Sequence, residues 1–517
     1  GVMASNQWVA IENEDAGEDD EPEHYWYYFQ ANGKALTNGD NDKVSLKTIN
    51  GKKYAFDDEG KMLYGWVDED SAERVDDTDS DGFKEGVYYF GGEDDGAMTT
   101  GWLQLDITYD EATTDDYKYT AAAFNDDEDQ TRWFYFKSNG KKIYAEDGDR
   151  TKDKTINGKK YAFDQYGAMV AEWSLDEEDL GTNPQAFTSS VASSAEVITG
   201  KAFDSKYTES WKYFSSVEDG ARVSKGWFKV VPAEFLNEDK YNDDEDFWYY
   251  ADGSGNLYAG EFKTIKGKKY AFRNDGRMLN GLKFIKEDAD NQSLSVYADD
   301  DDTWNFDNED DFLDHAAEFY EPEGYKCFYF GDGDDGAMRT NKTNVEIDGE
   351  NHNFYFEKSG GNKGAGVTGE EDDKLYQSGM LLKADSDDKY IVVEKTTHVN
   401  ADGKAEYSTY RKLDDAKEFM SAEGVQVKDE LDSKNGKDAV NIGNGNTKKA
   451  EDLSEAYSIT YKTEANSKGD KKEYILVNTS GKIVDGKGKN KDGSDYYYVT
   501  EKKANGENSI VAIYVED

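Results

Sequence analysis

Short aromatic runs, each followed by a glycine-containing polar turn, recur along most of the chain. Lys53-Tyr54-Ala55-Phe56 alternates in the manner of a half-buried strand, whose successive side chains point to opposite faces. Asn50-Gly51 in front of this run is a signal for a type I′ hairpin turn, and Asp58-Glu59-Gly60 behind it marks a second turn. The pattern therefore predicts a β-hairpin in which aromatic rings supply most of the buried surface.

The same hairpin recurs at a regular interval. Three segments share the core KTI-x-GKKYAF, and their tyrosines Tyr54, Tyr161 and Tyr270 lie 107 and 109 residues apart. The segments are Lys47–Trp66, Lys154–Trp173 and Lys263–Leu282. Self-similarity at a fixed period of this kind indicates a repeat architecture.

Two further hairpins flank each copy, so the full period is three hairpins, named A, B and C in chain order. The A hairpins contain the aromatic runs that begin at Trp26, Trp133 and Trp248. The C hairpins contain the runs around Tyr88, Tyr213 and Tyr329, two of them followed by Gly-Ala-Met and the second by Gly-Ala-Arg. A shortened fourth round is predicted at His352–Phe356 and Lys374–Met380.

The composition supports an all-β chain. Low hydrophobicity and high charge usually indicate disorder, but Tyr, Phe and Trp make up 14% of the 517 residues, and disordered chains are poor in them. Glycine outnumbers proline 49 to 4, which suits many tight turns with positive φ. Aromatic strands joined by such turns are typical of β proteins.

The net charge of −51 argues against binding to DNA, RNA or an anionic membrane, because like charges repel. No stretch reaches the roughly 18 apolar residues of a membrane span, so membrane insertion is not expected. Cys327 is the only cysteine, which excludes a disulfide framework and a cysteine metal site. No signal peptide is recognised and the chain opens in mid-repeat, so we expect a mature or trimmed chain.

The pattern of Gly-Trp, an aromatic-aromatic-Phe run, a turn and Gly-x-Met resembles the cell-wall-binding repeats of Gram-positive surface proteins. That family includes choline-binding modules, glucan-binding repeats and the repetitive domains of clostridial toxins. The resemblance implies a β-solenoid of stacked β-hairpins with three hairpins per superhelical turn. We expect a partial leading repeat at residues 1–25, the repeat array at 26–382 and an atypical β-rich C-terminal cap or small domain at 383–517.

Long acidic insertions interrupt the repeats and are expected at the B-to-C and C-to-A connections. They are Val67 to Glu85, Leu103 to Thr131, Ser174 to Ser210 and Lys283 to Lys326. Insertions in solenoids map to particular faces, so an acidic, loop-covered side and a barer side are predicted. In the C-terminal region, strands are expected at Tyr474–Val477, Tyr496–Val499 and Ile510–Val515, with one short helix between Leu413 and Leu431.

The resemblance also implies ligand sites between consecutive hairpins, where aromatic rings hold a choline by cation–π attraction or stack on a sugar. The candidate rings are Trp26, Tyr28, Trp66, Tyr88, Trp102, Trp133, Tyr135, Trp227, Trp248 and Tyr250. The alternative for each ring is a place in the core between hairpins. The sequence departs from the pattern where Ala171-Glu172 precedes Trp173, where Leu282 replaces a tryptophan, and where Asn341 stands in the place of Trp102.

Acidic turns suggest a second kind of site. Ca²⁺ favours clustered oxygens beside a glycine that permits a sharp turn. The candidate ligands are Asp94, Asp95, Asp332, Asp334 and Asp335, and a further carboxylate-dense run spans residues 76–82. No complete EF-hand pattern follows, so solvated turns are the alternative and no other cofactor is expected.

Catalytic signals are weak, and an enzyme is not expected. The four histidines form no HExxH motif and lie in no recognisable triad. The leading hypothesis is a secreted bacterial surface protein that binds wall teichoic acid, choline or glycan. One alternative is a structural repeat protein that self-associates into an extracellular filament or surface layer. Another is the binding region of a larger enzyme.

Overall fold

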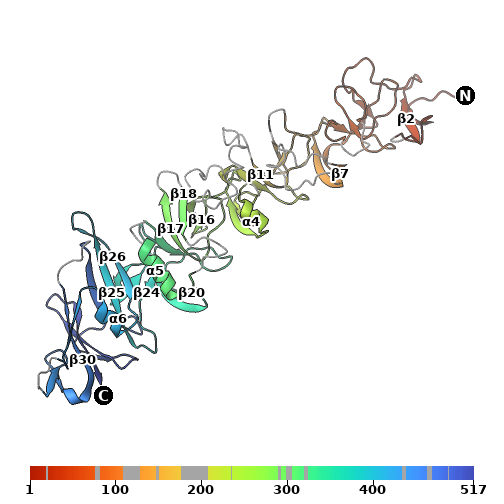
Figure 1. Cartoon of the computed structure of the whole chain (residues 1–517). Coiled ribbons are helices and arrows are strands. Elements are labelled where there is room, and N and C mark those ends of the chain that lie inside the picture. Colours follow the sequence, from red (N-terminus) through yellow and green to blue (C-terminus); the bar gives the residue numbers. More distant parts are fainter. Residues whose placement is uncertain are drawn as a thin grey trace. The chain divides into compact units, whose positions relative to one another are not determined.

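The structure is a computed structural model and is shown in Figure 1. It describes residues 1–18, 21–75, 82–108, 129–146, 149, 151–175, 208–233, 236–288, 293–297, 306–319, 324–432, 438–462, 469–486 and 488–517. Two compact units divide the chain: Gly1–Gly260 with Asn274–Arg277, and Glu261–Arg273 with Met278–Asp517. Antiparallel strands dominate both units, as the all-β prediction requires. No helix in the described ranges is long and apolar enough to cross a membrane.

In the first unit, a recurring two-stranded sheet joins a tryptophan-bearing strand to an aromatic strand. In every pair a tryptophan lies opposite a tyrosine, as Trp102 lies opposite Tyr135. The pairs are β1 (Gln7–Glu12) with β2 (His24–Phe29), β5 (Trp66–Val67) with β6 (Tyr88–Tyr89), β7 (Gly101–Thr108) with β8 (Asp129–Phe136), β11 (Glu172–Leu175) with β12 (Trp211–Phe214), and β13 (Gly226–Val230) with β14 (Phe247–Ala251). The short helix α4 (Glu238–Asn242) lies between the last two strands.

This pairing corrects the expected position of the insertions. Sequence reasoning placed them between hairpins, but each one connects the two paired strands of a single hairpin. Residues 109–128, for example, lie between β7 and β8, whose strands pair from Gly101–Phe136 to Thr108–Asp129. The error arose because the Gly-Trp strand follows directly on the preceding hairpin, whereas its hydrogen-bonding partner lies beyond the insertion. Residues 176–207, which make up most of the third insertion, lie outside the described ranges.

The B hairpins have the predicted turns. Asn50 and Gly51 have φ values of 50° and 82°, the left-handed conformation that a type I′ turn requires at both central residues. The hairpins are β3 (Lys47–Ile49) with β4 (Lys52–Tyr54), β9 (Lys152–Ile156) with β10 (Lys159–Phe163), and β15 (Glu261–Ile265) with β16 (Lys268–Phe272). In the third copy Lys266 takes the place of asparagine with φ 48°.

Consecutive hairpins are joined by one repeated device, which explains the spacing of the Gly-x-Met motif. The backbone N–H of Met169 donates to the carbonyl oxygen of Trp133 at 2.9 Å, and that of Met338 donates to Lys269 at 2.8 Å. The methionine side chain then covers the turn glycine of the following hairpin. A Cβ on Gly220 would lie 2.3 Å from Met169 Sδ, so a side chain at this glycine requires the methionine to move. The turn of the following hairpin therefore needs a glycine at the position that the methionine side chain covers.

The second unit continues with larger sheets. A three-stranded sheet has the order β18 (Ser293–Tyr297), β17 (Leu282–Asp288), β19 (Lys326–Tyr329). A five-stranded sheet has the order β20 (Asn341–Ile347), β21 (Glu350–Phe356), β24 (Met380–Leu381), β23 (Lys374–Gln377), β22 (Gly369–Glu371). Helix α5 (Glu309–Phe319), labelled in Figure 1, belongs to the fourth insertion and contacts β23 and β26 (Ala405–Lys412).

The C-terminal strands form two main sheets. The first has the order β26 (Ala405–Lys412), β25 (Tyr390–Val399), β31 (Lys471–Asn478), and the second β27 (Val425–Asp429), β30 (Leu453–Tyr461), β34 (Asn508–Glu516), β33 (Tyr497–Lys502), β32 (Lys489–Lys491). Smaller elements are the pair β28 (Ala439–Asn441) and β29 (Thr447–Lys449), helix α6 (Ala416–Ser421), which contributes Phe419 to the core, and the 3₁₀ turn η1 (Ala450–Asp452). The predicted strands and the short helix are thus confirmed.

One core spans both sides of residue 382 in the second unit. Met380 and Leu382 share it with Ala384, Val393 and Val477, all of which are buried. The last repeat strands and the first strands of the C-terminal region therefore stabilise each other. The superhelical turn of three hairpins and the domain limits at 25 and 382 stay predictions.

Candidate functional site

A pocket of about 490 Å³ lies at the junction of the second A hairpin with its B hairpin. Trp102 from β7, Trp133 from β8 and Tyr161 from β10 line it together with Met169. The ring of Trp102 lies 6.2 Å from that of Trp133 at an angle of 90°, and 4.9 Å from that of Tyr161 at 69°. Three rings from two hairpins thus meet at steep angles around one hollow.

Carboxylates from the following C hairpin complete the pocket. Glu218 accepts hydrogen bonds from Nε1 of Trp133 at 3.4 Å and from Nε2 of Gln104 at 3.3 Å. Asp219, also in the lining, lies 3.9 Å from Nζ of Lys159. The pocket therefore combines aromatic faces with negative charge, and three consecutive hairpins contribute to it.

The first round repeats this arrangement. Trp8 contacts Tyr28 at 5.2 Å and Tyr54 at 4.9 Å between ring centroids, both edge to face. Trp26 Nε1 donates to Oδ1 of Asp94 at 2.9 Å, as Trp133 donates to Glu218. Hydrogen bonds from Trp26 and then His24 hold the pKa of Asp94 below its usual range. The structure thus joins Trp26, Tyr28 and Asp94 in one corner.

Sequence reasoning missed three of these rings: Trp8, Tyr54 and Tyr161. Tyr54 and Tyr161 belong to the KKYAF strand, which was used to detect the repeat but was not considered for the site. Trp8 precedes the first recognised hairpin and lacks the glycine of the Gly-Trp signature. The strand register identifies Trp8 as equivalent to Trp102, because Trp8 pairs with Tyr28 as Trp102 pairs with Tyr135.

Two predicted site residues lie in the core instead. Trp66 is 4% exposed and Tyr88 is 5% exposed. Phe83, from the insertion between β5 and β6, and Lys142 from the next A hairpin cover Trp66, with Lys142 Nζ 5.3 Å from the Trp66 ring centroid. The insertion therefore fills the space that the open pocket leaves free at Trp102.

Trp173, which the sequence marked only as a departure from the pattern, and the other candidate rings follow the same division. Trp173, preceded by Ala171-Glu172, is 6% exposed and donates from Nε1 to the carbonyl oxygen of Val231 at 2.7 Å, so it belongs to the core. Tyr135 contacts Trp102 at 5.1 Å. In the third round Trp227 lies 6.3 Å from Trp248 at 87° and 5.1 Å from Tyr250 at 77°, the geometry found around Trp102.

One alignment made from the sequence is wrong. Asn341 was placed at the position of Trp102, but the strand register shows that Lys342 occupies it. Lys342 pairs with Tyr355 as Trp102 pairs with Tyr135, and Asn341 pairs with Phe356 as Gly101 pairs with Phe136. The fourth round therefore carries a lysine where the open pocket carries its central tryptophan.

The calcium candidates have other partners. Asp335 forms an ion pair with Arg339 and accepts a hydrogen bond from the backbone N–H of Ala337 at 3.2 Å. Asp332 accepts a hydrogen bond from the Tyr329 hydroxyl at 2.9 Å. Across the described ranges, no group of three or more His, Cys, Asp or Glu is arranged to hold a metal ion. The run at 76–82 lies outside the described residues except for Gly82.

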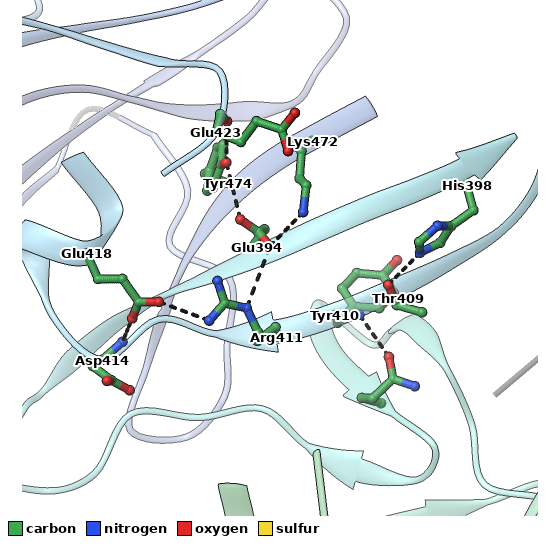
Figure 2. Close-up of polar contacts among 11 residues, drawn as sticks. Glu394, His398, Thr409, Tyr410, Arg411, Asp414, Glu418, Glu423, Lys472 and Tyr474 are labelled. Atoms are coloured by element: carbon green, nitrogen blue, oxygen red, sulfur yellow. Dashed lines mark hydrogen bonds and ion pairs between the residues drawn. The ribbon is translucent and has the colours of Figure 1, made fainter. Parts of the chain in front are cut away.

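The C-terminal region holds a separate polar cluster around Glu394, shown in Figure 2. The Glu394 carboxylate, 6% exposed, lies 3.0 Å from Lys472 Nζ and 3.7 Å from Arg411 Nε. The hydroxyl of Tyr474 donates to it at 3.3 Å, and burial followed by the charge of Glu394 raises the pKa of Tyr474. These contacts tie β25 to both β26 and β31, which is a structural role.

Comparisons with known proteins give one curated relative and several solved structures of low identity. No family model matches the chain. Glucosyltransferase-S of Streptococcus mutans is 25% identical over 285 residues, which are 50% of this chain and 16% of that protein. Among solved structures, the modular autolysin LytC of Streptococcus pneumoniae aligns over 76% of this chain and 56% of its own, at 15% identity and a TM-score of 0.29. Choline binding protein F of the same organism aligns over 67% and 95%, at 18% identity and a TM-score of 0.27.

The repeats of this chain resemble choline-binding and glucan-binding repeats in their motifs, and half of the chain matches glucosyltransferase-S. The resemblance rests on the recurring Gly-Trp, aromatic-run and Gly-x-Met motifs. Because the chain spans 16% of the glucosyltransferase, no activity of that whole protein is transferred to it.

Proposed function

We propose that this chain is a non-catalytic, extracellular attachment protein that binds cell-wall polymer or glycan at the bacterial surface. The observation that supports this most directly is the pocket in which Trp102, Trp133 and Tyr161 meet beside Glu218. The equivalent corner around Trp8 indicates that the arrangement recurs rather than arising once by chance.

The ring geometry suits two related ligands. A quaternary ammonium group is attracted to the faces of several aromatic rings at once, by about 0.5–1 kcal/mol per ring in exposed sites and about 2 kcal/mol when desolvated. A sugar ring can stack on one of the same faces with its apolar side. Glu218 adds a negative charge at the edge of the pocket, which favours the cationic ligand, a choline carried by the wall polymer.

Weak single sites are sufficient for attachment when they are linked. Binding at one site raises the effective concentration of the polymer at the next, so the overall affinity can exceed that of either site by about 10²–10⁴. The pocket at Trp102 and the equivalent ring cluster at Trp8 belong to one compact unit, so one repetitive polymer can bind at both. Self-association need not be invoked for avidity of this kind.

Retention of the full chain on three matrices tests the proposal: immobilised choline, insoluble glucan and purified cell walls. The double variant Trp102→Ala, Trp133→Ala should lose most of the retention on the matrix that binds the wild type. Tyr241→Ala is the matched control, because Tyr241 is an aromatic residue of α4 that is 38% exposed and lies outside the pocket lining. Equal retention of the double variant and the wild type would contradict the proposal.

The match to glucosyltransferase-S favours a second candidate, the binding region of a larger glucan-acting enzyme. This candidate predicts retention on glucan and release by soluble glucan but not by choline. Attachment through choline predicts the reverse pattern, so the competition experiment separates them.

A further inference from the structure

A second pocket, of about 440 Å³, lies in the second unit where the fourth-round sheet meets the turn after β31. On one side, this pocket is lined by β20 and β21, which correspond to β7 and β8 of the aromatic pocket. Lys342 replaces Trp102, since each pairs with the tyrosine of the aromatic-run strand, and Asn353 replaces Trp133. The latter equivalence follows from the register, because Asn353 pairs with Asn344 as Trp133 pairs with Gln104.

The opposite wall is also equivalent. Lys374 and Tyr376 of β23 hold the places of Lys159 and Tyr161 of β10, since Lys374 and Lys159 each begin the second strand of a tight antiparallel hairpin. Leu381 replaces Met169, because a Cβ on the turn glycine Gly481 would lie 2.7 Å from Leu381 Cδ1, just as one on Gly220 would meet Met169.

The acidic edge of the aromatic pocket has changed as well. Glu218-Asp219 directly precede the turn glycine of that junction, and Thr479-Ser480 directly precede Gly481 here. Both carboxylates are thus replaced by hydroxyls. The aromatic pocket therefore has two tryptophans and two carboxylates at four positions. The equivalent four positions of the second pocket have a lysine, an asparagine and two hydroxyl groups.

The lining of the second pocket is positively charged. The described lining contains three lysines and no aspartate or glutamate, in a chain whose net charge is −51. The lysines are Lys342, Lys374 and Lys383. Lys383 Nζ contacts an amide oxygen, Oδ1 of Asn353, at 3.4 Å, and Lys342 Nζ lies 3.6 Å from the exposed carboxylate of Asp372.

Hydrogen-bonding groups surround these charges. Asn353 Nδ2 donates to Oδ1 of Asn344 at 3.0 Å, which orients both amides, and Thr343, Thr479 and Ser480 add hydroxyls. Phe354, Tyr376 and Leu381 are buried and form an apolar floor. Lysine donors satisfy phosphate or carboxylate oxygens, and neutral amides and hydroxyls satisfy alcohols.

We propose that this pocket binds an anionic group, a phosphate or a carboxylate, carried on a hydroxyl-bearing chain such as a polyol or sugar. The proposal uses the junction geometry of the aromatic pocket but not its ligand. Attachment through the aromatic rings can therefore fail while anion binding holds, and the reverse is equally possible.

Calorimetric titration of the full chain at low ionic strength tests it with three probes: glycerol 3-phosphate, glucuronate and glycerol. We expect glycerol 3-phosphate or glucuronate to bind and uncharged glycerol not to bind. Comparison of the two anions distinguishes a phosphate ligand from a carboxylate ligand. Binding should weaken as salt is added, because salt screens the lysine charges.

The double variant Lys374→Met, Lys383→Met keeps much of the alkyl length and removes two charges. Binding of the anion should fall at least ~10-fold, since a hydrogen bond to a charged group is worth more than one decade of affinity. The matched control Lys449→Met removes an exposed lysine that pairs with Glu451 at 3.6 Å and lies outside the pocket lining. It should bind the anion as the wild type does.

Absence of binding by both anions would overturn the proposal, as would unchanged binding by the double variant. Should the double variant unfold, the two single variants replace it, and each should weaken binding. Retention of the double variant on the matrix that binds the wild type shows that the aromatic pocket is intact, which keeps the two proposals separately testable.

Discussion

Lys142 occupies a junction position at which other hairpins carry methionine, and replacing it should stabilise the protein. Lys142 is 3% exposed, and its aliphatic chain covers Gly167 as Met169 covers Gly220. The ammonium group donates to the carbonyl oxygen of Phe83. Burial lowers the pKa of Lys142 to about 7, and the charge of Asp164 opposes this only in part. The variant Lys142→Met removes the buried charge and retains the packing.

The magnitude follows from the displaced pKa. A fall from the ordinary 10.5 to about 7 corresponds to about 5 kcal/mol at ~1.36 kcal/mol per pH unit, as an upper value for the charged side chain. Loss of the donor to the Phe83 carbonyl costs about 1–3 kcal/mol. We therefore expect Lys142→Met to raise the free energy of unfolding by about 2–4 kcal/mol at pH 7.

The pH dependence gives the sharper test. Between pH 7 and 10.5 the unfolded chain holds the Lys142 proton and the folded chain does not, so wild-type stability rises with pH across this window. Asp164, whose pKa burial raises to about 6, is ionised throughout it and contributes no slope there. The advantage of the variant should therefore shrink from pH 7 upward and become a deficit near pH 10.5.

Urea unfolding of the full chain at pH 7, 8, 9 and 10 measures this difference, with tryptophan fluorescence as the signal. Lys137→Met, which removes an exposed lysine of the same hairpin, is the control and should show no pH-dependent difference from the wild type. A Lys142→Met variant that is less stable at pH 7, or whose advantage does not change with pH, would refute the reasoning.

Three further outcomes are expected from unfolding measurements. Gly220→Ala should cost more than Gly158→Ala, by about 1–3 kcal/mol, because both have positive φ but only a Cβ on Gly220 meets a methionine; equal costs would contradict the junction device. Phe83→Ala should cost about 3–4 kcal/mol, since this fully buried ring covers Trp66; a smaller loss would place the insertion outside the core. Glu394→Ala should cost about 2–3 kcal/mol, because it leaves two cations beside an emptied site; Glu394→Gln, which keeps the hydrogen-bond acceptor, should cost less.

Local turn chemistry allowed much of the fold to be predicted. Asn50-Gly51 specifies a type I′ turn because both residues tolerate positive φ, and the structure has that turn. The aromatic alternation of the KKYAF segments likewise predicted strands at Tyr54 and Tyr161, and the C-terminal strands followed from the same rule. These features depend on neighbouring residues alone.

Strand pairing across the insertions could not be obtained in the same way. Trp102 and Tyr135 pair although they lie 33 positions apart in the sequence. No short hairpin-turn motif between them indicates that their strands pair. The insertions were therefore placed between hairpins rather than within them. Phe83 shows the consequence, because an insertion residue fills the space beside Trp66 and closes a predicted site.

The amino-acid sequence by itself determined where hairpins form, which residues turn and that aromatic rings recur at set intervals, because each of these depends on short-range conformational preference. Only the tertiary structure decided which rings enclose a pocket and which are buried, because Tyr161 and Glu218 reach Trp133 from two later hairpins. It also decided that Lys342 stands where Trp102 does, since hydrogen-bond register, and not residue similarity, sets which side chains face each other.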